Sequence, residues 1–339
     1  MKKSLTHLFT ACLILVLIAK RDFISYLFMQ GQGQFEVLWN AKSIEDLLNN
    51  ESGNEELKLK ILLVEEIKSF AKTKLGLESE GLYETIYEQN GEDILWNLTA
   101  CEPYALTSVE WTFPIVGSVS YKGFFDIDRA KREEQELKES GFDTRIRPVN
   151  AWSTLGWFSD PILSKNLSRS EGDIAELFIH EITHANVFLK DSLIFNENLA
   201  SFVGEHGAMM FLETRFGIGS KEVKKYAQSE NDSKTFIDHC LKGVSELDSL
   251  YKTFPKEMSI AKKDSLKNLY MANWVDRLDS IPFHDELAYH GRFEEKLPNN
   301  AFFMAFDRYD SKKEAFSQQL KNEFQNDLKA FISFYKKQN

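Results

Sequence analysis

The sequence contains little cysteine, which removes one class of small protein from consideration. Its 339 residues include three cysteines, Cys12, Cys101 and Cys240. Such wide and unpatterned spacing excludes a disulfide-stapled scaffold and a zinc site built from cysteine thiolates. Cys12 lies in an apolar run, so at most one disulfide, between Cys101 and Cys240, remains open.

An excess of basic residues is also missing. Lysine and arginine number 41 against 52 aspartate and glutamate, and the formal net charge is −11. Because nucleic-acid binding relies on a basic face that displaces counterions, this balance predicts no nucleic-acid partner. The composition, with 43% hydrophobic and 27% charged residues, is that of an ordinary globular protein. A chain of this length can bury a large core.

A long hydrophobic run is lacking as well. The most apolar stretch runs from Leu8 to Ala19 and is ended by Lys20 and Arg21. It is short for a membrane span and suits the core of a signal peptide. A cleavage site after Ala19 would need a small residue two positions earlier, where Leu17 stands.

We therefore predict that residues 1–25 form an uncleaved signal anchor, with a cleaved signal peptide as the main competing interpretation. Lipoprotein-type cleavage before Cys12, or a buried helix of the fold, would also account for the run. Positive charges flank both ends of the apolar stretch, so charge bias leaves its orientation open. Residues 26–339 would then form one domain outside the cytoplasm, in the periplasm or at the cell surface.

The rest of the chain predicts an α+β fold with many helices. Apolar residues at helical spacing predict two helices between residues 41 and 75, and a charged helix is predicted over 128–140. The aromatic and β-branched segment 94–125 and the segment 144–152 predict the strands of a small sheet. From residue 221 onward the pattern is again mostly helical.

The segment 173–188 reads DIAELFIHEITHANVF and predicts a helix that carries chemistry. His180 and His184 are four residues apart, so both imidazoles lie on one helix face and can reach one atom. Glu181 stands between them in the H-E-x-x-H pattern, which binds zinc through the two histidines and uses the glutamate as general base. The competing interpretation is a pair of buried histidines that only make local hydrogen bonds.

A catalytic zinc ion needs a third protein ligand. Glu197 lies 13 residues beyond His184 and opens a second helix, which a short loop would fold back beside the first. We favour Glu197 as this ligand, and Glu205, two turns further along, is its competitor. His206 points elsewhere on the helical wheel, while Ser201 could orient a histidine ligand weakly.

HEITH followed by FNENLASFVG resembles the gluzincin metallopeptidases, and more specifically a largely bacterial family of zinc aminopeptidases. In that family the third zinc ligand is the glutamate of an N-E-x-x-A helix, which corresponds here to Glu197. The resemblance implies a mostly helical gluzincin-like fold, with a small mixed sheet beside the HExxH helix. Further motifs that fit the family are YL at 26–27, QGQGQ at 30–34, WNLTA at 96–100, WTFPIVG at 111–117, YKGFF at 121–125, STLGWF at 153–158, DP at 160–161, LPNNA at 297–301 and Tyr309.

Together these features predict a membrane-anchored zinc-dependent peptide hydrolase, an aminopeptidase by its resemblance, with residues 26–339 as a single catalytic metallopeptidase domain. Zn²⁺ would be held by His180, His184 and Glu197, and Glu181 would act as general base on a metal-activated water. Tyr309 is the predicted donor to the developing oxyanion, with Tyr121 and His290 as competitors. The competing functions are those of a zinc endopeptidase, a hydrolase of cell-wall peptides, or a non-catalytic metal-binding protein.

Overall fold

The computed structural model describes residues 21–50, 54–113, 117–149, 160–190, 192–309 and 313–338, without the side chains of residues 193 and 307–309. The predicted signal anchor, residues 1–25, therefore lies mostly outside the described residues. Residues 21–25 form the first turn of a helix, where Arg129 donates hydrogen bonds to the Ser25 hydroxyl and the Asp22 carbonyl. The division of the chain at residue 25 stays a prediction.

Helices dominate the described part of the chain, as expected for a mostly helical α+β fold. The predicted break between the two helices of residues 41–75 is present, because α3 ends at Asn49 and α4 begins at Glu55. None of the described helices has the length and apolar content of a membrane span. The α-helices are α2 (Arg21–Asn40), α3 (Ile44–Asn49), α4 (Glu55–Phe70), α5 (Ile127–Glu139), α6 (Glu171–Asn186), α7 (Leu193–Phe216), α8 (Lys221–Lys252), α9 (Ile260–Leu278), α10 (Glu286–Tyr289), α11 (Asn300–Tyr309), α12 (Lys313–Phe324) and α13 (Leu328–Lys336), with a π-helical turn at Ala71–Leu75 and a 3-10 turn at Ser164–Ser168.

The strands form three small sheets in the described residues. β2 pairs antiparallel with β1 and parallel with β8, which makes a mixed sheet. β3 lies between β6 and β7 in an antiparallel sheet, and β4 pairs with β5 in a hairpin. The strands are β1 (Lys42–Ser43), β2 (Thr85–Tyr87), β3 (Trp96–Cys101), β4 (Trp111–Phe113), β5 (Gly117–Val119), β6 (Lys122–Phe124), β7 (Asp143–Pro148) and β8 (Ile162–Leu163).

The mixed sheet lies beside the HExxH helix, as predicted. Ile162 and Leu163 of β8 line the same small cleft as Phe178 and Glu181 of α6. Ser170 caps the N-terminus of α6 by accepting a hydrogen bond from the Asp173 backbone amide. β8 and the short turn after it therefore lead directly into α6, the helix that carries the two histidines.

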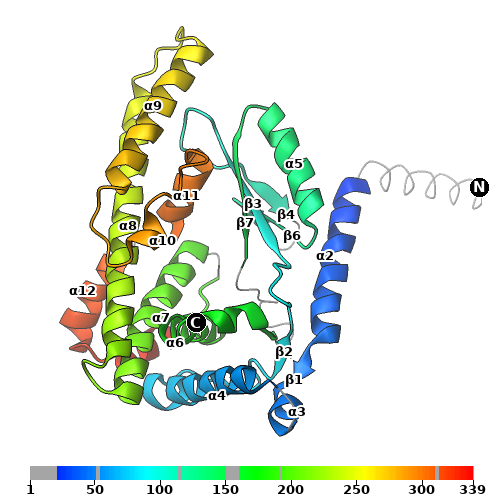
Figure 1. Cartoon of the computed structure of the whole chain (residues 1–339), viewed down its shortest axis with the longest axis vertical. Coiled ribbons are helices and arrows are strands. Elements are labelled where there is room, and N and C mark those ends of the chain that lie inside the picture. Colours follow the sequence, from blue (N-terminus) through cyan, green and yellow to red (C-terminus); the bar gives the residue numbers. More distant parts are fainter. Residues whose placement is uncertain are drawn as a thin grey trace, which may run out of the picture.

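Three buried apolar clusters hold the described elements together. The largest surrounds α6 and α7 and includes residues from α4, α12 and α13. A second, rich in aromatic rings, joins α8, α9 and α11 around Trp274. A third packs Tyr26 of α2 against the β3–β6 sheet and α5. In Figure 1, α8 and α9 run along one side of the molecule and α2 along the opposite side, with α6 and α7 between them.

Cys101 and Cys240 are both buried thiols, so the disulfide left open by the sequence is not formed. Burial raises the pKa of the Cys101 thiol to about 12, with a further contribution from Asp143. This thiol is therefore protonated and unreactive at neutral pH.

Candidate metal centre

The site is built by the close packing of α6 and α7. Gly204 of α7 allows this approach, because a Cβ atom there would lie 2.9 Å from the Glu176 backbone oxygen and 3.2 Å from the His180 Cβ. Asn196 fixes the loop between the helices, since its side chain accepts a hydrogen bond from the Leu189 amide and donates one to the Leu189 carbonyl. The helix pair therefore places the start of α7 beside the His180–His184 face of α6.

Three donor atoms converge between the two helices. The Nε2 atoms of His180 and His184 are 3.1 Å apart. The carboxylate oxygens of Glu197 lie 3.7 Å from the first nitrogen and 3.6 Å from the second. Ligand atoms of a tetrahedral zinc ion, at bond lengths near 2.0–2.1 Å, are separated by about 3.3 Å. The three residues thus fit a zinc ion both in spacing and as the His₂Glu donor set of catalytic zinc sites.

Glu205, the competing third ligand, belongs to a different group of side chains. It forms an ion pair with Lys313 and lies with Glu176 and Glu230 in a cluster of carboxylates. The described residues bring Glu197, and not Glu205, to the two histidines.

The imidazole of His180 is neutral at physiological pH. Burial is the largest cause of its low pKa of about 3, and repulsion from His184 adds to it. Burial also acts to lower the pKa of His184, but the hydrogen bond and charge of Glu197 raise it above its ordinary value. A neutral imidazole offers a lone pair to a metal ion, so His180 is prepared for coordination.

The Glu181 side chain lines a small cleft beside α6. Burial raises the pKa of its carboxyl to about 7, although the charge of His184 acts in the opposite direction. The cleft has a volume of about 20 Å³ and is lined by Glu181, Leu177, Tyr83 and Ile162 among others. This volume is large enough for a water molecule beside the carboxyl group.

Sequence reasoning did not find Tyr83, which borders the cleft. Its ring packs edge-on against Phe178, with ring centroids 4.9 Å apart. Burial, followed by the charge of Glu181, raises the pKa of the Tyr83 phenol well above its ordinary value. Its backbone has φ of 57°, a left-handed conformation that is uncommon for a tyrosine. No motif or periodicity marked this position.

Two further polar side chains of α7 occupy defined positions near the site. The Ser201 hydroxyl lies 3.4 Å from Nδ1 of His180, on the side of the ring opposite Nε2. It can therefore influence the orientation of the His180 ring. Nδ1 of His206 instead lies 2.9 Å from the Phe202 carbonyl, so this histidine stands apart from the three donors.

The carboxylate cluster of Glu176, Glu205 and Glu230 is a second feature that sequence reasoning missed. Its residues come from α6, α7 and α8, and one oxygen of each lies within 4.8 Å of the others. Tyr226 donates a hydrogen bond of 2.9 Å to Glu176. Burial and mutual repulsion raise the pKa of both Glu176 and Glu230. The cluster adjoins the metal centre because Glu176 is one helical turn before His180.

Of the three candidate oxyanion donors, the structure describes the side chains of His290 and Tyr121. Tyr309 is the last residue of α11, and its side chain lies outside the described part of the structure. Nε2 of His290 is 2.9 Å from the Ile281 carbonyl, and its ring packs against Phe283. Tyr121 lies in the short connection between β5 and β6, and its charge contributes to the raised pKa of Tyr26. The role of Tyr309 stays a prediction.

Two imidazoles, a carboxylate and a neighbouring half-buried glutamate form a site of the class that can hold a divalent metal ion for hydrolysis. Comparison of the sequence with known proteins gives the family. The sequence model described as "Putative aminopeptidase" matches residues 25–338, and the chain belongs to this family. The description is that of a peptide hydrolase. No curated protein and no solved structure matches the chain.

Proposed function

We propose that this protein is a zinc-dependent aminopeptidase of the gluzincin type. The observation that carries the proposal is the convergence of His180, His184 and Glu197 at zinc-like spacing, with Glu181 next to His180 in the chain. Membership of the aminopeptidase family supports peptide hydrolysis as the reaction. The carbonyl carbon of a peptide bond, held between the donor atoms and the cleft of Glu181, is the point of attack.

The residues of the chain take separate roles in this proposal. The two histidines and Glu197 would hold Zn²⁺, which when bound supplies Lewis acidity for the carbonyl and lowers the pKa of water. The Glu181 carboxylate accepts the proton of the attacking water in its cleft. It then delivers this proton to the nitrogen of the departing amine, so that it ends the reaction ionised as it began. The raised pKa of Glu181 suits a group that must both take and give a proton near neutral pH.

Metal analysis of the purified protein is the first test. We expect about one zinc ion per chain, and loss of the metal in His184→Ala, because removal of an imidazole leaves two ligands. A purified protein that binds no metal after incubation with Zn²⁺ would contradict the proposal.

Glu181→Gln tests the chemistry separately from metal binding. Glutamine keeps the size of the side chain but cannot accept the proton, so we expect zinc content to stay and kcat/KM to fall roughly 10²–10⁴-fold. Glu136→Gln, on the exposed side of α5, is the matched control and should keep full activity. A fully active Glu181→Gln enzyme would show that another group moves the proton.

The choice of substrate separates aminopeptidase from endopeptidase. Aminoacyl-arylamides require attack next to a free amine, whereas internally quenched peptides with blocked ends require cleavage within a chain. We expect turnover of the first class. Turnover of the second class alone would instead support an endopeptidase or a hydrolase of cell-wall peptides.

We also propose that the chain is attached to a membrane through its N-terminal apolar segment, with the catalytic domain outside the cytoplasm. The supporting observation is the run Leu8–Ala19 between basic residues. Resistance of the full-length protein to extraction from membranes at alkaline pH is the expected result. Complete release into the soluble fraction would contradict the attachment.

A further inference from the structure

Helix α2 has one face that is firmly held by the protein. Tyr26 is 6% exposed, and its hydroxyl donates a hydrogen bond of 2.9 Å to the Gly123 carbonyl. The side chain of Gln30 donates to the same carbonyl. Gly33 lies so close to Phe125 that a Cβ atom would fall 2.2 Å from its ring, and Val37 is 2% exposed. The four α2 residues recur at helical spacing, so this inner face packs on β6 and its surroundings.

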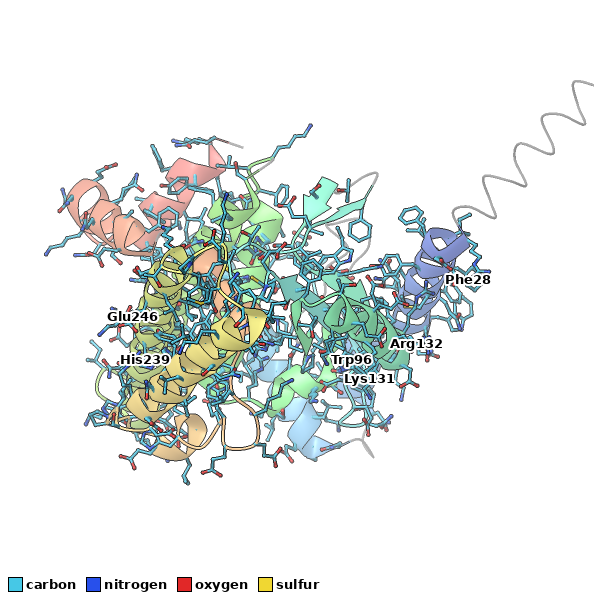
Figure 2. The ribbon with its side chains drawn as sticks, turned by 90° about the horizontal axis from the view of Figure 1, so that it is seen from above. Phe28, Trp96, Lys131, Arg132, His239 and Glu246 are labelled. Carbon is cyan, nitrogen blue, oxygen red and sulfur yellow. The ribbon has the colours of Figure 1, made fainter. Side chains whose placement is uncertain are left out.

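The opposite face of α2 is apolar and exposed to solvent. We define the outer face as Ile24, Phe28, Phe35 and Trp39, whose exposed fractions are 40%, 73%, 62% and 75%. Their spacing of four, seven and four residues places them on one stripe. The rings of Phe35 and Trp39 stack with centroids 5.4 Å apart. Figure 2 shows α2 at the outer edge of the molecule, where Phe28 is labelled.

This arrangement is unusual for a helix on the surface of a soluble domain, which places polar residues outward. The acidic residues Asp22 and Glu36 lie outside the stripe, whereas Arg21 stands at its N-terminal end on the same side. A contiguous exposed apolar patch of this kind marks an interaction site. The outer face of α2 is therefore expected to contact a partner.

The chain before α2 identifies the occupant. The apolar run Leu8–Ala19 ends two residues before Arg21, where α2 begins. An α-helix rises 1.5 Å per residue, so Phe28 lies about 10 Å along the helix from Arg21. A lipid bilayer that takes up the apolar run Leu8–Ala19 is therefore close enough to contact the outer face. Tryptophan and phenylalanine favour the membrane–water interface, and arginine favours its headgroups.

We propose that the outer face of α2 lies along the surface of a lipid bilayer and so fixes how the catalytic domain sits on the membrane. The inference rests on the proposed membrane attachment and not on the peptidase chemistry. α2 spans about 30 Å, which allows the whole stripe to contact the lipid headgroup region at once. In Figure 1, α8 and α9 lie on the side of the molecule opposite α2, and they would point away from the membrane.

Site-specific photo-cross-linking in the full-length protein tests this inference. The photoreactive residue p-benzoylphenylalanine replaces Phe28, Phe35 or Trp39 in turn, and the protein is reconstituted into vesicles of phosphatidylethanolamine and phosphatidylglycerol. Ile218 and Leu287 are matched control positions, because they are apolar and 87% and 95% exposed but lie outside α2. The readout is the mass of the adduct after illumination.

We expect lipid adducts at the three positions of the outer face, in at least roughly tenfold higher yield than at the controls, which corresponds to a preference of about 1.4 kcal/mol. Adducts between two protein chains would overturn the inference in favour of a second copy as occupant. Absence of lipid adducts from vesicle-bound protein would overturn it as well. Protein that fails to associate with vesicles would refute the membrane attachment together with this inference, while zinc content and Glu181-dependent turnover would still decide the proposed function.

Discussion

Two glutamates of α6, Glu176 and Glu181, both have a raised pKa, but different neighbouring charges act on each. Burial raises the pKa of both Glu176 and Glu181. Among the charges that act on these pKa values, His184 and Glu197 act on Glu181, whereas Glu205 and Lys313 act on Glu176. The metal centre and the carboxylate cluster therefore adjoin each other on α6 but draw on different partners. Substitutions at the cluster can be studied without removal of a proposed zinc ligand.

Glu230→Gln is expected to make stability less dependent on pH. Burial, followed by the charges of Glu176 and Glu205, raises the folded-state pKa of Glu230 above its ordinary 4.5. Between the unfolded and folded pKa values the folded protein binds more protons, so its free energy of unfolding falls as pH rises. Because glutamine cannot ionise, the free energy of unfolding of the variant does not fall in this way as pH rises. We therefore expect a melting temperature above that of the unmodified protein by roughly 2 °C or more near pH 8, and nearly no difference near pH 4.

The control for this experiment is Glu257→Gln, at an exposed position in the loop between α8 and α9. It should change the melting temperature little at either pH, because surface substitutions contribute within about 0.5 kcal/mol. An equal effect of Glu230→Gln at both pH values would show that burial does not perturb this carboxyl.

For single residues, the sequence predicted site residues that lie close to one another along the chain and missed those that lie far apart along it. His180, Glu181 and His184 lie within one turn and a half of helix, so their proximity follows from helical geometry alone. Tyr83 precedes Glu181 by 98 residues, and Glu230 follows Glu176 by 54. Contacts across such separations depend on how whole elements pack, which single-residue patterns do not contain.

At the scale of elements, α6 shows how well the spacing of apolar residues predicts the bounds and the buried face of a helix. Ile174, Phe178 and Ile182 are fully or nearly fully buried, and the helix spans Glu171–Asn186 against the expected 173–188. Ala185, which follows Ile182 at helical spacing, is exposed in the last turn of α6. The pattern therefore predicted the helix and its inner face, but not where the buried part of that face ends.

Gly204→Ala is expected to damage both stability and metal binding. The added Cβ would lie 2.9 Å from the Glu176 backbone oxygen, so α6 and α7 must separate. Overpacking of this kind costs about 1–3 kcal/mol, and the better helix propensity of alanine returns about 1 kcal/mol. We expect a net loss in the free energy of unfolding, measured in urea, and a lower zinc affinity, because Glu197 and the histidines belong to different helices.

Gly31→Ala is the matched control on α2, since no atom lies within 4 Å of a Cβ at that position. Alanine there should stabilise the protein by about 0.5–1 kcal/mol through helix propensity alone. If Gly204→Ala were as stable as Gly31→Ala and bound zinc equally well, close approach of the two helices would not be what positions the site.

At the scale of the whole molecule, the strands illustrate what a single sequence leaves open. Segments rich in aromatic and β-branched residues predicted strands between 94 and 152, and β3, β6 and β7 form there. The mixed sheet could be expected only from the family resemblance, because β1, β2 and β8 are two or three residues long and join segments far apart in the chain. Strands this short carry too few residues for an alternating pattern. Ile86 of β2 and Ile162 of β8 belong to the buried cluster around α6 and α7, which holds these strands in place.

A buried ion pair joins the aromatic core to the sheet and provides the last test. Lys267 of α9 is 6% exposed, and its ammonium donates to Asp143 at the start of β7 over 2.5 Å and to the Pro103 carbonyl over 2.9 Å. The same Asp143 oxygen accepts a hydrogen bond from the backbone amide of Asn300, where α11 begins. One carboxylate thus ties three elements that are distant in sequence.

Lys267→Met keeps the apolar stem of the side chain but leaves Asp143, whose side chain is 17% exposed, without its cation. Removal of one partner of such a pair costs about 3–5 kcal/mol, so we expect unfolding at a markedly lower urea concentration. Lys262→Met, at an exposed position in the first turn of the same helix, should change this midpoint little. Asp143→Asn added to Lys267→Met removes the orphaned charge while the amide oxygen still accepts from Asn300, and it should restore part of the loss. Unchanged stability of Lys267→Met would mean that the aromatic core alone holds α9 to the sheet.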